Sequence, residues 1–439
     1  MSKIKPQIPK GFRDFLPSQK VTRQHVIDTI RNVFEVFGFE PLETPALEYA
    51  SILEGKYGEE GEKLIYKFED RGGRKVALRY DLTIPLSRVI AMYPTLPKPF
   101  KCYQISPVWR ADKPQKGRFR EFWQCDADIV GSESMFADAE VITTIHHILK
   151  ALNFKQFTIK INNRKLLNGI AQSLGFPVEK ITSLLRIIDK LDKKGMEGIK
   201  DEMRQQGFPD ENINNILELF IVSKGNHNEL VYLKSRFSDS PLVREGIQEL
   251  DELFSHLSSM DVDSNGYCFD LSLARGLDYY TGPIFETTVD EPKIGSISGG
   301  GRYDNLIGMF SDTDFPATGS SFGLERVIAV MEELNIVPSH ATTTEVLMTR
   351  FSPDMHQDSL QVASALRSAG IKTDVYFTHD KLKKQLTYAS NKGIPIVIIQ
   401  GPDEKKDSKV MLRNMIKGIQ KTVALDDLAF TIKQELNEL

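Results

Sequence analysis

The stretch Pro107–Gly131, which reads PVWRADKPQKGRFREFWQCDADIVG, carries the most regular pattern in the chain. From Glu121 onward its residues alternate between two faces. One face holds Trp123, Cys125, Ala127 and Ile129, and the other holds Phe122, Gln124, Asp126 and Asp128. Because successive side chains of a strand point to opposite sides, this spacing predicts a strand with one apolar and one polar face.

A basic loop precedes this strand. The partner strand is predicted at Lys101–Arg110, and the connection contains Asp112, Lys113, Lys116, Gly117, Arg118 and Arg120. A solvated hairpin would also have this composition. However, Arg110 and Arg118 carry guanidinium forks that pair with phosphate or carboxylate oxygens, and Phe122 offers a ring on which a base can stack. The loop and the polar face together suggest a triphosphate site.

The order of these residues is similar to the second signature motif of class II aminoacyl-tRNA synthetases: an arginine, an acidic residue, a loop, then a second arginine and a phenylalanine. The form KGRFREFWQCD (116–126) resembles in particular that of histidyl-tRNA synthetases. The resemblance implies an α+β catalytic domain, an antiparallel sheet flanked by helices, with a helical insertion and a C-terminal α/β anticodon-binding domain. The expected boundaries are 1–162 and 263–335 for the two catalytic parts, 163–262 for the insertion and 343–439 for the anticodon-binding domain.

The composition is that of an ordinary soluble globular protein, with 41% hydrophobic and 26% charged residues, and 439 residues predict two or three domains. No apolar run approaches the roughly 20 residues of a membrane span, and the opening residues lack a signal-peptide core. Cys102, Cys125 and Cys268 are far apart and form no CxxC pair, which favours a reducing compartment. We therefore expect a cytoplasmic protein with no membrane partner.

The N-terminal region resembles the family's first motif. Apolar residues at helical spacing predict a helix over Gln19–Phe37 that ends at Gly38, and Pro41 and Pro45 bracket a predicted short strand. In the resembling family this motif forms the dimer interface. The resemblance thus implies a homodimer through the N-terminal helix and this motif.

A hairpin is predicted over Leu64–Thr83, with its turn at 70–73. Its second strand would place Arg79, Asp81 and Thr83 on one face. The resemblance implies that this position binds the substrate's α-amino group, which an acid and a hydroxyl suit physically.

Helical periodicity dominates from Asn163 to about Met260, without a catalytic pattern. The sheet is predicted to resume at Gly266 and to continue through Arg275–Gly282 (RGLDYYTG) and SISGGGRYD (296–304), whose glycines permit close backbone approach to a ligand. RGLDYYTG resembles the motif that is most diagnostic of histidine as substrate. ATGSSFGLERVIAVM (317–331) resembles the third class motif.

Beyond a polar linker at 335–344, short β-branched runs alternate with helical stretches and predict an α/β domain. Between Lys381 and Lys421 ten basic residues stand against three acidic ones, a local charge of about +7. A solvated helix face and loop would also explain this charge. The extent of the region resembles the anticodon-binding domain, and the resemblance implies that tRNA(His) is a partner.

Amino-acid activation requires little proton chemistry. The attacking carboxylate has a reference pKa near 3.5 and is ionised at neutral pH, so the barrier lies in bringing two anions together. Positioned cations meet that need, and the chain has no Walker loop, HExxH or zinc-spaced cysteines. His146 and His147 diverge by about 100° on a helix, so a metal site built from protein ligands alone is not expected.

The resemblance assigns roles residue by residue. Arg110 and Arg275 would be the catalytic cations, on opposite sides of the α-phosphate. ATP, with Mg²⁺, would be held by Arg110, Asp112, Arg118, Phe122 and Arg326. L-Histidine would be held by Asp81, Thr83, Gln124, Asp128, Tyr279 and Tyr280. Imidazole offers one donor and one acceptor, which Asp128 and Tyr280 can match. Asp128 replaces the glutamate of many bacterial relatives, so it would reach the imidazole either directly or through water.

The resulting hypothesis is a histidine–tRNA ligase that uses ATP and forms histidyl-adenylate. The alternative is a catalytically inactive synthetase paralogue that acts as a regulatory or tRNA-sensing module. Such a paralogue would be expected to lose the C-terminal domain, the RGLDYYTG motif or the arginines, and all of these are present in the sequence.

Overall fold

The computed structural model describes residues 4–55, 61–115, 117–222, 227–260, 262–274, 279–292, 294–337 and 342–438. The chain forms two compact units, a larger one of residues 1–13 and 26–337 and a smaller one of residues 14–25 and 338–439. Helix α1 (Pro17–Val36) contributes residues to both. Within the described ranges, no helix is long and apolar enough to cross a membrane.

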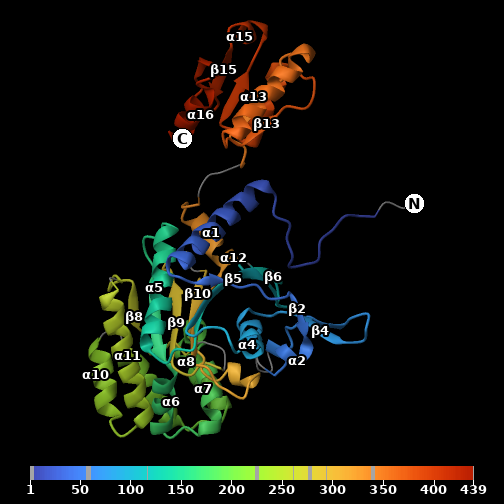
Figure 1. Cartoon of the computed structure of the whole chain (residues 1–439). Helices are drawn as coiled ribbons and strands as arrows, with labels where there is room; N and C mark the ends of the chain where they lie inside the picture. The colour runs from blue at the N-terminus through green and yellow to red at the C-terminus, as the bar shows by residue number, and fades with distance from the viewer. Residues whose placement is uncertain are drawn as a thin grey trace. The chain divides into compact units, whose positions relative to one another are not determined.

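An eight-stranded sheet forms the centre of the larger unit (Figure 1). In spatial order its strands are β1 (Glu40–Pro41), β5 (Phe100–Trp109), β6 (Glu121–Val130), β11 (Ala317–Gly323), β10 (Ser298–Arg302), β9 (Pro283–Thr288), β7 (Thr158–Asn163) and β8 (Tyr267–Phe269). The outermost pairs, β1–β5 and β7–β8, are parallel, and all pairs between them are antiparallel. The predicted antiparallel catalytic sheet is therefore confirmed.

Strand β6 has the two faces that its sequence predicts. Its apolar side chains are in the main hydrophobic core, with Cys125 fully buried and Trp123 packed against the edge. Its polar side chains line a cavity on the other face. The strand pairs with β5 from Trp109 opposite Glu121 to Phe100 opposite Val130, and with β11 on its other edge. A one-residue slip in this register would turn the polar row into the core.

Helices cover the apolar face of this sheet. Helix α5 (Met135–Ala151) begins at Ser134, whose hydroxyl accepts the N–H of Phe136 over 3.2 Å. Helix α12 (Leu324–Glu333) follows β11 directly. Ala139, Ile142 and Ile145 of α5 are fully buried, and the core that they join extends from the sheet into the helical segment described next.

The chain between β7 and β8 is helical. Its elements are α6 (Arg164–Ser173), η1 (Val178–Lys180), α7 (Ile181–Ile188), α8 (Leu191–Gln205), α9 (Asp210–Val222), α10 (His227–Arg236) and α11 (Pro241–Ser259). Figure 1 shows α6, α7, α8, α10 and α11 gathered in one group, coloured green to yellow-green. Helix α11 packs against both α5 and α6, which joins this group to the catalytic core. Gly195 interrupts α8 with φ 69°.

A small three-stranded sheet and two helices flank the central sheet. They are β2 (Leu47–Tyr49), β4 (Lys75–Leu78) and β3 (Lys67–Glu69), with α2 (Ala50–Leu53) and α4 (Thr83–Met92). The predicted turn at 70–73 is confirmed, because the N–H of Gly73 donates to Asp70 O over 3.0 Å.

The prediction that this strand continues to Thr83 is wrong, because β4 ends at Leu78. Asp81 accepts the N–H of Ile84 over 3.2 Å and so satisfies a free donor in the first turn of α4. The strand expected between Pro41 and Pro45 is also absent, since β1 and β2 lie on either side of that segment.

The smaller unit contains a five-stranded sheet. Its strands, in spatial order, are β13 (Thr373–Val375), β12 (Val346–Met348), β14 (Ile396–Ile399), β15 (Lys409–Asn414) and β16 (Gln420–Ala424). Its helices are η3 (Pro353–Met355), α13 (His356–Ser368), α14 (Leu382–Lys392), α15 (Pro402–Lys406) and α16 (Leu428–Asn437). The first three strands are parallel and the last two antiparallel. The α/β prediction is confirmed.

Candidate active site

A cavity of about 810 Å³ opens on the polar face of β6. Its lining includes all of the predicted site residues that fall within the described ranges. These are Asp81, Thr83, Arg110, Asp112, Arg118, Phe122, Gln124, Asp128, Tyr279, Tyr280 and Arg326. The remaining predicted residue, Arg275, lies outside the described residues.

Arg110 occupies a central position in this cavity. Its Nε donates to the carbonyl of Tyr80 over 3.0 Å, and its guanidinium carbon lies 4.2 Å from the Tyr80 ring centroid and 5.1 Å from that of Phe122. Two aromatic rings and a carbonyl thus restrict the orientation of this guanidinium at the cavity wall.

Two further arginines lie on the side of the cavity formed by the loop after β5 and by α12. Arg326, at the start of α12, donates from Nη1 to the carbonyl of Ser296 over 2.8 Å. Arg118 lies 3.9 Å from Asp112, and its side chain is 41% exposed. The Arg118 side chain is therefore partly open to solvent at the cavity wall.

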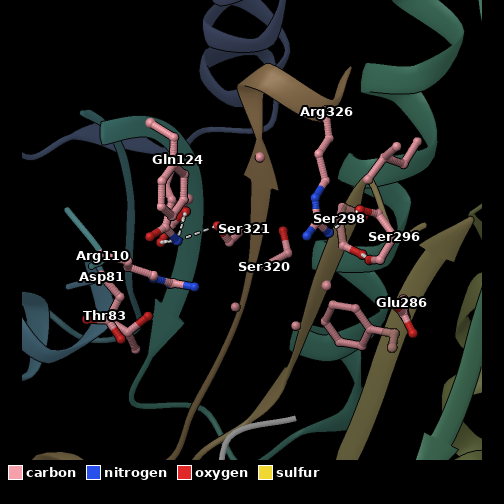
Figure 2. Close-up of a pocket in the computed structure, with 18 of the residues that line it drawn as sticks. Asp81, Thr83, Arg110, Gln124, Glu286, Ser296, Ser298, Ser320, Ser321 and Arg326 are labelled. Atoms are coloured by element: carbon pink, nitrogen blue, oxygen red, sulfur yellow. Dashed lines mark hydrogen bonds between the residues drawn. The ribbon is translucent and has the colours of Figure 1, made fainter. Parts of the chain in front are cut away.

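On the opposite side, polar groups lie close to Arg110. Figure 2 shows Asp81, Thr83 and Gln124 with Arg110 on one side of the strand that carries Ser320 and Ser321, and Arg326 on the other. Gln124 donates from Nε2 to Ser321 Oγ over 2.7 Å, and its buried Oε1 has no hydrogen-bond partner among the described residues. An unused buried acceptor is costly unless a ligand N–H reaches it.

Asp128 lies in a small aromatic chamber. The phenol of Tyr303 donates to its Oδ1 over 2.5 Å. Tyr279 lies next to this pair, with ring centroids 5.9 Å from Tyr303 and 5.1 Å from Tyr280. The chamber depends on Gly319 in the facing strand, since an added Cβ there would lie 1.9 Å from Asp128 Oδ1.

Three acidic side chains, Asp81, Asp126 and Asp128, line the same cavity and are each at most 3% exposed. Burial raises the pKa of Asp128 to about 7, against the lowering effect of the Tyr303 hydrogen bond. Burial, with a contribution from Asp128, also raises the pKa of Asp126 well above its usual range. A cationic ligand beside these buried acids would lower their raised pKa values and so favour their ionised forms.

Several residues that line the cavity were not predicted from the sequence. Tyr303 directly follows the SISGGGR segment, so its position beside the glycines was an available signal. Tyr80 adjoins Asp81 and could have been found in the same way. Arg186, Asp189 and Lys190 belong to the helical segment and carry no local pattern that points to this cavity.

A buried ion-pair network adjoins the chamber that contains Asp128. Arg302 donates from Nε to Asp138 Oδ2 over 3.1 Å and from Nη1 to the carbonyl of Ser132 over 2.9 Å. Asp304 accepts a hydrogen bond of 2.6 Å from the hydroxyl of Thr281, just after the tyrosine pair. Because Tyr303 lies between Arg302 and Asp304, this network restrains both walls of the chamber.

The described residues contain no group of three or more His, Cys, Asp or Glu side chains that could hold a metal ion. His146 and His147, whose ring centroids are 5.8 Å apart, lie outside the cavity.

Comparison with known proteins gives consistent results. A family profile described as "Histidyl-tRNA synthetase" matches residues 11–327, and one described as "Anticodon binding domain" matches residues 336–435. A histidine–tRNA ligase of Cytophaga hutchinsonii is 42% identical over 97% of this chain and 98% of its own length.

Solved structures agree. The crystal structure of histidyl-tRNA synthetase from Nostoc sp. PCC 7120 is similar with a TM-score of 0.89 and 35% identity, covering 99% of this chain and 100% of that one. An ATP phosphoribosyltransferase regulatory subunit/histidyl-tRNA synthetase from Bacillus halodurans C has a TM-score of 0.74 at 22% identity, over 88% and 97% of the two chains, which shows a shared fold. With a family profile spanning most of the chain and a full-length relative above 40% identity, the chain belongs to the histidyl-tRNA synthetase family.

Proposed function

We propose that this chain attaches L-histidine to tRNA(His) in an ATP-dependent reaction through histidyl-adenylate. The observation that carries the proposal is the division of the cavity into two parts. Three buried acids and the tyrosines Tyr279, Tyr280 and Tyr303 line one part together with Arg110, and Arg118 and Arg326 line the other. Such a cavity suits a substrate with two basic groups and a carboxylate, next to a polyanion.

In the proposed first step the histidine carboxylate attacks the α-phosphate of ATP. A carbon–oxygen–phosphorus linkage forms and pyrophosphate leaves, without a proton transfer. Arg110 contacts the carboxylate and the α-phosphate, and Arg275 contacts the α-phosphate from the other side. These cations reduce the repulsion between the two anions and stabilise charge that builds up in the transition state.

ATP is held by its base and by its phosphates. Phe122 and Arg326 stack on the two faces of adenine, which a phenyl ring and a planar guanidinium both favour. Arg118 binds the γ-phosphate, and Asp112 orients Arg118 from 3.9 Å away. The partial exposure of Arg118 supports a role at the outer end of the nucleotide.

Histidine is held at both of its polar ends. Asp81, Thr83 and Gln124 bind the α-ammonium group, and the unused Oε1 of Gln124 supports this placement. Asp128 and Tyr280 bind the two imidazole nitrogens, beside Tyr279. Because each buried partner is left unpaired by an analogue that lacks the hydrogen bond, selectivity of about 10⁴-fold is attainable without editing.

Magnesium fits this site as an ion held mainly by the nucleotide. Mg²⁺ commonly binds one or two carboxylates together with substrate phosphates. The carboxylate of Glu286, which Figure 2 places on the Arg326 side, would supply a hard oxygen ligand for such an ion. Bound Mg²⁺ would neutralise charge on the β- and γ-phosphates.

The smaller unit is proposed to bind the anticodon of the tRNA. We assign the two catalytic parts to 1–162 and 263–335, the helical insertion to 163–262 and the anticodon-binding domain to 343–439. At the carboxyl edge of the parallel strands β12 and β13, Phe377 is 83% exposed and Phe351 52% exposed. Exposed aromatic side chains at such an edge suit unstacked bases.

We also propose that the chain acts as a cytoplasmic homodimer, through α1 and the first motif. Apolar side chains of the three-stranded sheet support this surface: Leu47, Tyr49 and Phe68 are 42%, 54% and 49% exposed. Analytical ultracentrifugation should give twice the monomer mass, and Tyr49→Glu combined with Phe68→Glu should shift it toward the monomer. A monomeric wild type would contradict the proposal.

Pyrophosphate exchange into ATP tests the function directly. Histidine should stimulate exchange at least about 10³-fold more efficiently than any other standard amino acid. Arg110→Ala should abolish the exchange. The inactive-paralogue alternative requires the wild type to show no histidine-dependent exchange while still binding tRNA, so the same assay separates the two functions.

A further inference from the structure

The N-terminal segment Lys10–Arg13 packs on the loop that joins β5 to β6. The N–H of Arg120 donates to the carbonyl of Gly11 over 2.9 Å, and Arg120 Nη1 donates to that of Lys10 over 3.4 Å. Gly11 has φ +90°, and a Cβ at this position would lie 2.8 Å from Arg120 Cγ. Glycine is thus required by both the backbone conformation and the close approach.

Arg13 connects this loop to helix α12. Its guanidinium carbon lies 3.2 Å from the ring centroid of Phe119, and its Nη2 lies 3.5 Å from Glu325 Oε1. Glu325 is itself fixed, since its side chain is 4% exposed and accepts the N–H of Trp123 over 3.0 Å. A planar guanidinium can stack on a ring and pair with a carboxylate at the same time, which a lysine cannot do equally well.

The two residues that Arg13 contacts are neighbours in sequence of the ATP-side arginines. Phe119 follows Arg118, and Glu325 precedes Arg326. Phe119 and Glu325 line the cavity, whereas Arg13 does not. Arg13 therefore acts on the cavity through these neighbours.

We propose that Arg13 is a positioning residue for ATP, a role that rests on the function proposed above. By clamping the 117–120 part of the loop to the start of α12, it holds Arg118 and Arg326 at a set separation. Loss of the clamp leaves both arginines in place but lets the distance between them vary. The affinity for ATP should therefore fall. The two described contacts of Arg13, Phe119 and Glu325, do not belong to the histidine chamber, which is built from β6, β10 and the tyrosine pair.

The test compares Arg13→Gln, Arg13→Lys and wild type in histidine-dependent pyrophosphate exchange. Arg13→Gln should raise KM for ATP about tenfold and leave KM for histidine within about twofold, because a contact of this kind contributes roughly 1–2 kcal/mol. Arg13→Lys should recover part of the loss, since it keeps the charge beside Glu325. The melting temperature should remain near that of wild type.

Arg236→Gln is the matched control. Arg236 also lies over an aromatic ring, 5.7 Å from the Phe237 centroid, but in helix α10, and it does not line the cavity. Its loss should leave both KM values unchanged. An equal KM for ATP in wild type and Arg13→Gln, or a parallel rise in both KM values with a lower melting temperature, would overturn the positioning role.

Calorimetric titration with ATP alone provides a readout that needs no turnover. Wild type should bind ATP about tenfold more tightly than Arg13→Gln. If wild type fails to exchange pyrophosphate yet this difference in ATP affinity holds, the proposed function fails and the positioning role stands. If wild type exchanges normally and the affinities are equal, only the positioning role fails.

Discussion

The phenol of Tyr303 donates a hydrogen bond to Oδ1 of Asp128 over 2.5 Å, and both residues are at most 3% exposed. Burial raises the pKa of Asp128 to about 7, the Tyr303 hydrogen bond acts to lower it, and the nearby Asp81 acts to raise it. The carboxylate that we propose to recognise imidazole therefore titrates close to physiological pH.

Replacing Tyr303 with Phe should make histidine recognition more acid-sensitive. The substitution removes the hydrogen bond that favours ionised Asp128, so its pKa should rise above 7 by about one unit. In a pH profile of kcat/KM for histidine, the acid limb should move to higher pH by the same amount. Asp128→Asn should lack this limb and retain only the titration of histidine itself. If the acid limb of Tyr303→Phe lies at the same pH as that of wild type, the limb does not report the ionisation of Asp128.

Gly319→Ala should damage histidine binding through a steric clash. The added methyl would lie 1.9 Å from Asp128 Oδ1, so the carboxylate must move out of the chamber. KM for histidine should rise at least about 100-fold and the melting temperature should fall. Adding Asp128→Ala should recover part of the lost thermal stability, because the nearest clashing group is then gone while the carbonyl of Ala127, 2.9 Å from the added methyl, remains. A double variant as unstable as Gly319→Ala would show that the carboxylate is not the main source of the clash.

Phe377→Ala should weaken tRNA charging without affecting adenylate formation. Its ring is 83% exposed beside β13, and its carbonyl accepts a 3.0 Å hydrogen bond from Arg350, so the backbone below the ring is fixed. Loss of one base-stacking contact should raise KM for tRNA about tenfold, with pyrophosphate exchange unchanged. Phe430, 66% exposed on α16, is the matched control, and Phe430→Ala should charge tRNA normally. Equal effects of the two substitutions would contradict the proposal that tRNA bases bind at the carboxyl edge of β12 and β13.

His146→Leu should make the protein less sensitive to acid. His146 is 7% exposed, and both ring nitrogens lack hydrogen-bond partners among the described residues. Burial, together with the charges of Lys150 and His147, lowers its pKa below the ordinary 6.5. Between these two pKa values, His146 binds a proton in the unfolded chain but not in the folded chain. The free energy of unfolding therefore decreases as the pH falls from about 6.5 through the folded-state pKa.

Thermal denaturation between pH 7 and pH 5 measures this effect. Wild type should lose more stability over that range than His146→Leu. His147 is exposed, and His147→Leu should keep most of the acid sensitivity of wild type. Identical pH profiles for wild type and His146→Leu would contradict the prediction.

Much of the local structure follows from periodicity. The alternation in β6 specified which side chains enter the core and which enter the cavity, and the apolar spacing over Gln19–Phe37 located α1 within a few residues. Periodicity failed at 79–83, because Asp81 bonds to the backbone N–H of Ile84 and starts α4 where the side-chain pattern still reads as a strand. Hydrogen bonds of this kind compete with strand formation and leave no signal in the hydrophobic pattern.

The sequence by itself determined most strands and helices, and the motifs that identified Arg110, Gln124 and Arg326 as candidate site residues. Each of these features depends on residues a few positions apart. Only the tertiary structure decided that Tyr303 donates to Asp128 across 175 residues and that Arg13 lies on Phe119. Such contacts depend on which strands pair and in what register. Burial from all sides then sets the pKa of Asp128, a property that no short stretch of sequence contains.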